Sequence, residues 1–201
     1  MILLITPQNR QRYATQIDDY FRIRKLVFHD LLHWEVKVYG DQEYDIYDSM
    51  PCNYILSIDR DGAVQGGLRQ MPMAGPTLTW EKFSDMIDDP SDLFAPDVWE
   101  TTRFAVRPEK KDVRFMSGVN RVAVELCAAS LETGLESGAK RHVAVCEERV
   151  VRLTKSFKMP CAVLGRKLTP RREDILCVAW EVSDESVERL AWAKSHFEAA
   201  A

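Results

Sequence analysis

The 201-residue sequence predicts an α/β fold in which a single mixed sheet is flanked by helices. Two observations predict this fold class. First, apolar runs at residues 53–59 and 63–71 flank an Asp61-Gly62 pair, which is typical of a hairpin of antiparallel strands. Second, a strand-like run, a long helical pattern and another strand-like run succeed one another over residues 98–146, as in a parallel β-α-β unit. We expect one domain over 1–201, because a chain of this length can fill one core.

The N-terminal part predicts a strand, a helix and a loop. The apolar run 2–5 ends at Thr6-Pro7 and is too short for a signal peptide or a membrane span, so it predicts a strand. Residues 9–33 place apolar side chains at helical spacing and predict a helix. Residues 35–51 are polar, acidic and dotted with aromatics, and they predict a loop.

The remaining elements follow from the same patterns. Residues 72–96 are irregular, with a short helix expected near 83–87, and residues 98–106 predict a strand that stops at Pro108. Apolar spacing over 116–137 predicts a long helix that ends at Gly138. Further strands are expected at 142–146, 162–164 and 175–182, and helices at 147–157 and from Asp184 onward.

The overall composition narrows the classes of function. A net charge of −4 gives no general attraction to nucleic acid or to an anionic membrane, so we expect neither as a partner. The five cysteines are odd in number and lack zinc-type spacing, which predicts reduced thiols and a cytoplasmic location. His29 and His33 are four residues apart but have no third ligand at a metal-binding spacing, so no metal is expected.

Charged and aromatic residues occur in the first half at spacings that amphipathicity alone does not explain. They are Arg24, Phe28, Trp34, Asp45, Asp48, Arg69, Phe83, Glu100 and Arg103. A buried charge is costly unless it is paired or meets a ligand. The pattern therefore predicts a polar pocket for a zwitterion, in which aspartates hold the cation and arginines bind the anion. Each residue taken alone is more typical of a surface salt bridge, a solvated loop carboxylate or a core aromatic than of a ligand site.

Glu100 and Arg103 lie in the predicted strand 98–106, where simple alternation puts them on opposite faces. A bulge or the strand's end would bring both toward a cleft, where Glu100 is a candidate general base. An ion pair on an edge strand is the alternative. The sequence has no Gly-x-Ser-x-Gly elbow and no glycine-rich phosphate loop, which disfavours covalent catalysis and nucleotide-phosphate binding.

This ordered set of residues resembles the acyl-homoserine-lactone synthases of the autoinducer synthase family. The specific parts are Arg24-Lys-Leu-Val-Phe28 leading to Trp34, and Trp99-Glu-x-x-Arg103-Phe104-Ala-Val. The resemblance implies an acetyltransferase (GNAT)-like three-layer sandwich and a quorum-sensing acyltransferase. In that reaction the amine of S-adenosylmethionine takes an acyl group from a thioester, and lactonisation then releases methylthioadenosine. S-adenosylmethionine is a substrate, and no cofactor is expected.

The resemblance also implies a role for each residue. Glu100 would be the base, directly or through water; Asp45 and Asp48 would face the cationic side of the substrate, and Arg24 and Arg103 its carboxylate. The remaining substrate-binding residues are Phe28 and Trp34, which would close over the ligand, together with Phe83, Phe104 and Arg69. Arg69 is equally expected to pair with an acidic neighbour.

The sequence predicts the type of acyl donor and of acyl chain from weaker signals than those for the reaction. Val143, Ala144 and Val145 would line the acyl pocket, and the absence of threonine there favours an unsubstituted chain over a 3-oxo chain. The basic residues Arg149, Arg152 and Lys155 form either a solvated helix face or a docking site for an acidic carrier protein. The pyrophosphate-binding arm of acetyltransferases is missing after Val106, which favours acyl carrier protein over acyl-CoA. The alternatives are another N-acyltransferase on the same fold or a non-catalytic sensor of an adenosyl ligand.

Overall fold

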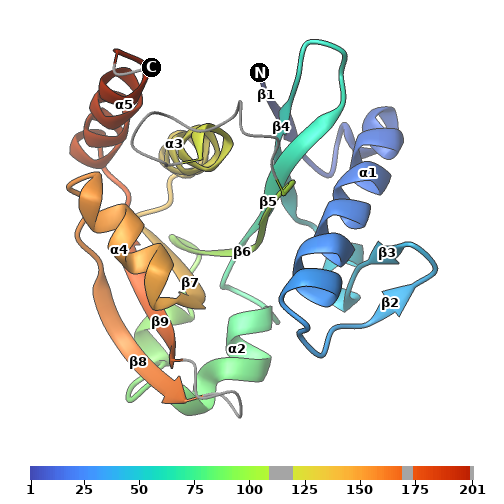
Figure 1. Ribbon diagram of the computed structural model, residues 1–201. Coiled ribbons are helices and arrows are strands. Elements are labelled where there is room, and N and C mark those ends of the chain that lie inside the picture. The colour runs from blue at the N-terminus through green and yellow to red at the C-terminus, as the bar shows by residue number, and fades with distance from the viewer. Residues whose placement is uncertain (109–119, 169–173, 200–201) are drawn as a thin grey trace. The chain divides into compact units, whose positions relative to one another are not determined.

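The computed structural model describes residues 1–108, 120–168 and 174–199. Its strands form a seven-stranded sheet in the order β1-β4-β5-β6-β7-β9-β8 and a separate two-stranded ribbon, β2-β3 (Figure 1). Strand β6 (Val98–Val106) pairs in parallel with β7 (Arg141–Glu147), whereas β1 with β4, β4 with β5, β7 with β9 and β8 with β9 are antiparallel. The predicted mixed sheet is thereby confirmed.

The chain divides into two compact units, residues 1–70 with 103–129 and 196–201, and residues 71–102 with 130–195. We describe each unit by itself. The expectation of one domain over 1–201 stays a prediction.

The first unit is built on three antiparallel strands, β1 (Ile2–Ile5), β4 (Asn53–Ile58) and β5 (Val64–Pro72). Successive side chains of a strand point to opposite faces, and the packing follows this alternation. Ile55 packs with Leu68 against Leu126 of α3 (Arg121–Glu136). Tyr54, one residue earlier, meets Tyr20 of α1 (Ala14–Arg24), which runs along one side of β4 and β5 (Figure 1).

The N-terminal helix predicted at 9–33 is confirmed, with a change of winding along its length. It begins as a 3₁₀ turn, η1 (Arg10–Tyr13), continues as α1 and ends as a π-helix, η2 (Lys25–Leu31). The loop predicted at 35–51 is partly wrong, because it contains the ribbon β2 (Val38–Tyr39) and β3 (Gln42–Glu43) and the 3₁₀ turn η3 (Ile46–Ser49). The ribbon turns at Gly40, whose φ of 62° suits glycine.

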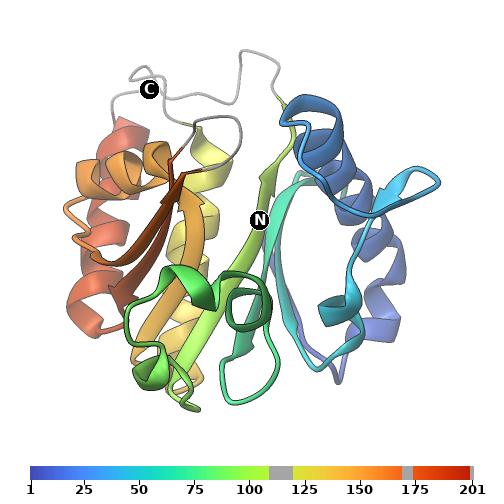
Figure 2. The ribbon, with the colours of Figure 1, turned by 90° about the horizontal axis from the view of Figure 1, so that it is seen from below.

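The second unit holds the first half of β6 with β7, β9 (Asp174–Glu181) and β8 (Ala162–Leu168). Val151 of α4 (Glu148–Ser156) packs on Leu176 and Val178 of β9. The ribbon shows this helix, in orange, beside the orange and red strands (Figure 2). Cys177 and Ala179, on the other face of β9, pack with residues of the 73–98 segment. Helices therefore cover both faces of these strands. The unit ends in α5 (Asp184–Ala199).

Three predicted elements have different bounds in the structure. The short helix begins earlier than 83–87, at α2 (Leu78–Phe83), because the Thr77 hydroxyl accepts a hydrogen bond from the Trp80 N–H and caps it; the 3₁₀ turns η4 (Ser84–Met86) and η5 (Ser91–Leu93) follow. Strand β8 extends to Leu168, beyond the predicted 162–164. The long helix is α3, and residues 116–119 of its predicted range lie outside the described residues.

The connection after α2 reaches the outer edge of β8. Ile87 forms an isolated antiparallel bridge with Gly165, and Lys167 Nζ lies 2.6 Å from Asp85 Oδ2. A methyl group on Gly165 would overlap the Met86 carbonyl, so only glycine allows this approach.

Within the described residues, none of the helices has the length and apolar character that a membrane crossing requires.

Candidate functional site

Three arginines and three carboxylates gather in the first unit. This charged cluster consists of Arg24 on α1, Glu43 on β3, Asp45 and Asp48 around η3, Arg69 on β5 and Arg103 on β6. The sequence places the two aspartates through a capping box: Asp45 accepts from the Tyr47 N–H, and Asp48 accepts from the Asp45 N–H at 2.7 Å. Three positive and three negative groups balance one another.

Arg24 is the innermost member and has no exposed side-chain surface. Its Nη1 and Nη2 donate to the two oxygens of Asp48 at 2.8 and 2.9 Å, and its Nε donates to Glu43 at 2.6 Å. These contacts are the planar, two-donor geometry that arginine forms with carboxylates. Nε, Nη1 and Nη2 of Arg24 are thus engaged within the cluster, and the expected contact of Arg24 with the substrate carboxylate stays a prediction.

Burial and pairing set the ionisation of the cluster. Burial by itself would raise the pKa of Asp48, but Arg24 and Arg69 outweigh it and the pKa falls well below its usual range. Burial raises the pKa of Tyr54, whose hydroxyl donates to Asp48 Oδ1 at 2.8 Å. Asp48 therefore stays ionised and Tyr54 stays a donor.

Asp45 and Arg103 form the part of the cluster that reaches the surface. Their side chains are 14% and 11% exposed, whereas those of Arg24 and Arg69 are fully buried. Arg69 donates to Asp45 Oδ1 at 2.6 Å, and Nη2 of Arg103 donates to Oδ2 at 2.7 Å. Of the predicted polar residues in this cluster, Asp45 and Arg103 are accordingly the ones that an incoming ligand can touch most directly.

Strand β6 carries an irregularity at Arg103. The residue has a φ of 57°, a conformation that non-glycine residues seldom adopt, and its carbonyl accepts a hydrogen bond from Tyr20 Oη at 2.6 Å. Buried positions along β6 are Val98, Glu100 and Thr102 before it and Ala105 after it, so the alternation shifts by one residue. The backbone is therefore irregular at Arg103, as the bulge considered from the sequence requires, and the direction in which Glu100 and Arg103 face stays a prediction.

Aromatic residues lie beside Arg103. Phe28 and Trp34 stack with ring centroids 5.1 Å apart and an interplanar angle of 8°, and the Arg103 guanidinium lies 5.7 Å from the Phe28 ring centroid. The stacking depends on the chain reversal at His33, whose φ is 52°, and on the hydrogen bond from Trp34 N to Phe28 O. Phe104 is 37% exposed. The predicted aromatic pair is therefore together, at the accessible side of the cluster.

Glu100 lies in the second unit and is fully buried. Its Oε2 accepts from the Thr79 N–H, and its Oε1 accepts from the Leu78 N–H at 3.3 Å and the Thr102 hydroxyl at 3.5 Å. Both amides belong to the first turn of α2, where negative charge is favoured. An ionised carboxylate accepts about four hydrogen bonds, so these three donors from the described residues leave room for one more. These hydrogen bonds hold the Glu100 carboxylate in place and leave one acceptor position that the described residues do not occupy.

The expected acyl-pocket residues divide between the two faces of β7. Val143 and Val145 pack in one apolar cluster with Phe83, Leu164 and Cys177. Ala144 lies between them on the strand, so alternation directs its side chain to the opposite face. Burial raises the pKa of the Cys177 thiol to about 12, with a further contribution from Glu100, and the thiol therefore stays neutral. The structure thus brings Phe83 together with two of the three expected residues.

The basic residues expected to dock a carrier protein are exposed on α4. Arg149 Nε lies 2.5 Å from Glu147, and Arg152 Nη1 lies 3.6 Å from Glu148. Lys155 is also exposed. Acidic neighbours at the start of the helix therefore offset part of the positive charge of this face.

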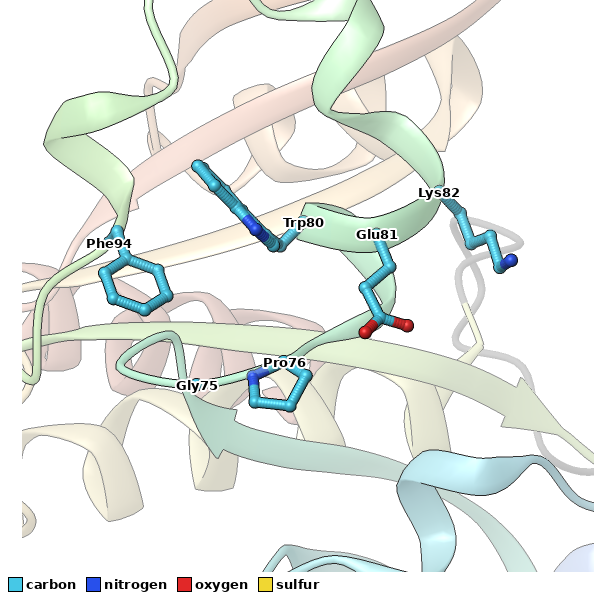
Figure 3. A pocket seen from close by; sticks show the side chains of 6 residues that line it. All are labelled: Gly75, Pro76, Trp80, Glu81, Lys82 and Phe94. Carbon is cyan, nitrogen blue, oxygen red and sulfur yellow. The ribbon is translucent and has the colours of Figure 1, made fainter.

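An open depression of about 590 Å³ lies beside α2. It is lined by Gly75, Pro76, Trp80, Glu81, Lys82 and Phe94 (Figure 3). The Trp80 and Phe94 rings lie 5.4 Å apart at one side of it. None of these six residues is a predicted site residue.

Sequence reasoning missed two groups at these sites. Glu43 binds Arg24 and has its second oxygen 3.3 Å from Arg103 Nη2. The available signal was charge balance, since three arginines had only two aspartates as expected partners. Thr79 beside Glu100 gave no signal, because a threonine at the start of a helix is ordinary.

Comparison with known proteins identifies the family. The autoinducer synthase family model matches residues 8–190. The chain belongs to the autoinducer synthase family. It is 29% identical over 164 residues to an acyl-homoserine-lactone synthase of Agrobacterium fabrum, covering 82% of this chain and 78% of the relative. The resemblance stated from the motifs is thus confirmed.

Solved structures of this family and of acetyltransferases have the same fold. The structure of MesI, a CoA-dependent acyl-homoserine lactone synthase, is 27% identical with a TM-score of 0.84, over 97% of this chain and 95% of that one. An N-acetyltransferase-type protein from Lactobacillus plantarum has a TM-score of 0.56 at 14% identity, over 90% of this chain and 99% of that one. The expected acetyltransferase-like fold of this autoinducer synthase is confirmed.

Proposed function

We propose that this autoinducer synthase is an acyl-homoserine-lactone synthase that acylates the amine of S-adenosylmethionine. The amine nitrogen attacks the thioester carbonyl, the new N–C bond replaces the C–S bond, and the donor leaves as a thiol. The substrate carboxylate then attacks its own γ-carbon, and the C–S bond to the sulfonium breaks to give the lactone and neutral methylthioadenosine. Family membership supports this reaction.

The observation that carries the proposal is the buried carboxylate of Glu100 on β6. Glu100 is a buried carboxylate held by the α2 amides, and Arg103, three residues later, is a partly exposed guanidinium paired with Asp45. An ammonium is no nucleophile, so a base must take its proton, and Glu100 has one lone pair left for this step. Arg103 would bind the substrate carboxylate through Nη1, since its Nε and Nη2 already donate to Asp45.

The other residues divide into substrate contacts and support. Asp45 would hold the cationic side of the substrate, and the stacked Phe28 and Trp34 would exclude water and attract the sulfonium. Arg24, Arg69, Asp48 and Glu43 would hold Asp45 and Arg103 in place, since their own contacts are internal to the cluster. Val143, Val145 and Phe83 would receive the acyl chain.

Two observations favour acyl-CoA over acyl carrier protein as the donor. MesI, to which this chain is similar, is a CoA-dependent synthase. On α4, Arg149 and Arg152 are paired with acidic neighbours, which weakens the electrostatic attraction between this helix and an acidic carrier protein. This reverses the preference drawn from the missing pyrophosphate arm.

A product assay tests the reaction. The purified protein is incubated with S-adenosylmethionine and a panel of acyl-CoA and acyl carrier protein thioesters, and mass spectrometry follows methylthioadenosine and lactone. Release of both supports the proposal; an N-acyl product without methylthioadenosine indicates a different N-acyltransferase. Binding of S-adenosylmethionine with neither product indicates the non-catalytic sensor.

Two sets of variants assign the roles. Glu100→Gln should bind S-adenosylmethionine but lose acylation, with the exposed Glu132→Gln as the matched control. Unchanged turnover in Glu100→Gln would exclude Glu100 as the base. Charge reversal at Arg149, Arg152 and Lys155 should leave acyl-CoA turnover unchanged. A loss confined to acyl carrier protein would restore the carrier as the donor.

A further inference from the structure

The hydroxyl of Thr79 is a buried polar group to which the described residues offer no hydrogen-bond partner. The residue has no exposed surface, and within the described part of the chain Oγ1 has no hydrogen-bond partner. Leaving a buried hydroxyl unpaired costs about 1–3 kcal/mol. Native structures generally satisfy such groups with water or a ligand.

Thr79 is also the residue whose backbone N–H donates to Glu100 Oε2. Within one threonine the hydroxyl lies about 3 Å from the backbone nitrogen. Oγ1 is therefore within about 6 Å of the Glu100 carboxylate, which is the span that one water bridges with two hydrogen bonds of about 2.8 Å. Glu100 has one acceptor site left for such a water, after Leu78, Thr79 and Thr102.

We infer that the Thr79 hydroxyl is a positioning residue for the acylation step, holding against Glu100 the water that carries the proton away from the substrate amine. The inference rests on the proposed function and adds a residue to it. The water accepts the proton of the substrate ammonium and passes a proton to the carboxylate, which frees the amine to attack the thioester. The remaining proton that the nitrogen loses on forming the amide leaves with the thiol. The hydroxyl fixes the orientation of this water.

The local structure makes this arrangement rigid. Thr77 caps α2 by accepting from the Trp80 N–H at 3.2 Å, and the same first turn presents the Leu78 and Thr79 amides to Glu100. The hydroxyl and the carboxylate therefore cannot move independently.

The test compares Thr79→Val, which removes the hydroxyl at constant shape, with Thr79→Ser, which keeps it. The matched control is Thr154→Val. Thr154 is buried to a similar degree, but its hydroxyl donates to Val151 O at 3.1 Å and accepts from Trp180 Nε1 at 3.3 Å. The control should lower the melting temperature and leave turnover unchanged, whereas Thr79→Val should lower turnover in a folded protein.

The pH profile gives a readout that packing alone would not change. The substrate amine has a pKa near 8, so at pH 6.5 it must be deprotonated on the enzyme, whereas at pH 8.5 most of it arrives as the free amine. For Thr79→Val we expect kcat to fall on the order of 10- to 100-fold at pH 6.5, with KM for S-adenosylmethionine little changed, and a smaller loss at pH 8.5. Thr79→Ser should restore most of the rate.

Each other result overturns the inference. Wild-type kinetics in Thr79→Val would show that the hydroxyl has no part in the step. An equal loss at both pH values that Thr79→Ser does not restore would indicate packing. If the wild-type protein releases neither methylthioadenosine nor lactone, the proposed function itself fails, and the inference falls with it.

Discussion

Arg103 donates two hydrogen bonds to the same oxygen of Asp45, Oδ2, one from Nε at 3.0 Å and one from Nη2 at 2.7 Å. The second oxygen of Asp45 accepts from Arg69 at 2.6 Å. Asp45 is therefore held between two guanidinium groups, one fully buried and one partly exposed. A ligand approaching this carboxylate meets Arg103 in a fixed orientation.

Arg103→Lys should retain the charge but lose the planar pair of donors. The loss of one charge-assisted hydrogen bond corresponds to a decrease of about 10- to 100-fold in kcat/KM for S-adenosylmethionine. Steady-state release of methylthioadenosine measures it. Arg121→Lys, at an exposed pair with Glu125, is the control and should be unchanged. Equal kinetics for the two variants would remove Arg103 from the site.

Arg24→Ala should destabilise the protein by about 3–5 kcal/mol, because it removes one of the three arginines that balance three carboxylates in the buried cluster. Arg22→Ala, on the same helix, removes an exposed arginine paired with Asp19 and Asp41 and should cost less than about 1 kcal/mol. Urea unfolding followed by circular dichroism compares them. Similar midpoints would mean that the interior pairs contribute no more than the surface pairs.

His142 should make stability depend on pH between about 4 and 6.5. Burial lowers its pKa to about 4, so below pH 6.5 the unfolded chain binds a proton that the folded chain does not. The contribution of His142 to stability is thus fully present above pH 6.5 and is lost as the pH drops toward 4. The free energy of unfolding should fall by about 2 kcal/mol between pH 7 and pH 5. Denaturant unfolding at these two pH values measures the difference, and His142→Asn should reduce it. A slope unaffected by the substitution would assign it to other groups.

Gly165→Ala should destabilise the protein by about 1–3 kcal/mol, since its methyl group would meet the Met86 carbonyl. Gly75→Ala is the control, because a methyl group there meets nothing within 4 Å. Thermal melting of both variants measures the difference in stability between them. A melting temperature for Gly165→Ala equal to that of Gly75→Ala would mean that the segment at Met86 moves aside without cost.

Regular local patterns predicted much of the fold. The Asp61-Gly62 turn identified the β4–β5 hairpin, and the run from Val98 to Val106 gave both bounds of β6. The ribbon β2–β3 was not predicted, because strands of two residues are too short to show an alternation of polar and apolar residues. Helix α2 was placed too late, because its start depends on the Thr77 cap, which hydrophobic spacing does not reveal.

Residue types identified most of the site, but tertiary contacts decide which members meet a ligand. Arg24 and Arg103 look alike in sequence, yet one is enclosed by carboxylates and the other reaches the surface. The left-handed φ of Arg103 could not be predicted, because it is maintained by a hydrogen bond from Tyr20, eighty-three residues away. Neither Glu43 nor Thr79 belongs to a motif, and their importance comes from what they contact.

The bridge between Ile87 and Gly165 also has a consequence for the behaviour of the protein in concentrated solution. Strand β8 ends the order of the sheet, and an edge strand with Val163 and Leu168 exposed is a template on which another chain can pair. Ile87 takes one of the ladder positions, and the ion pair of Lys167 with Asp85 places charge beside it. The segment that follows α2 therefore also protects the protein from aggregation.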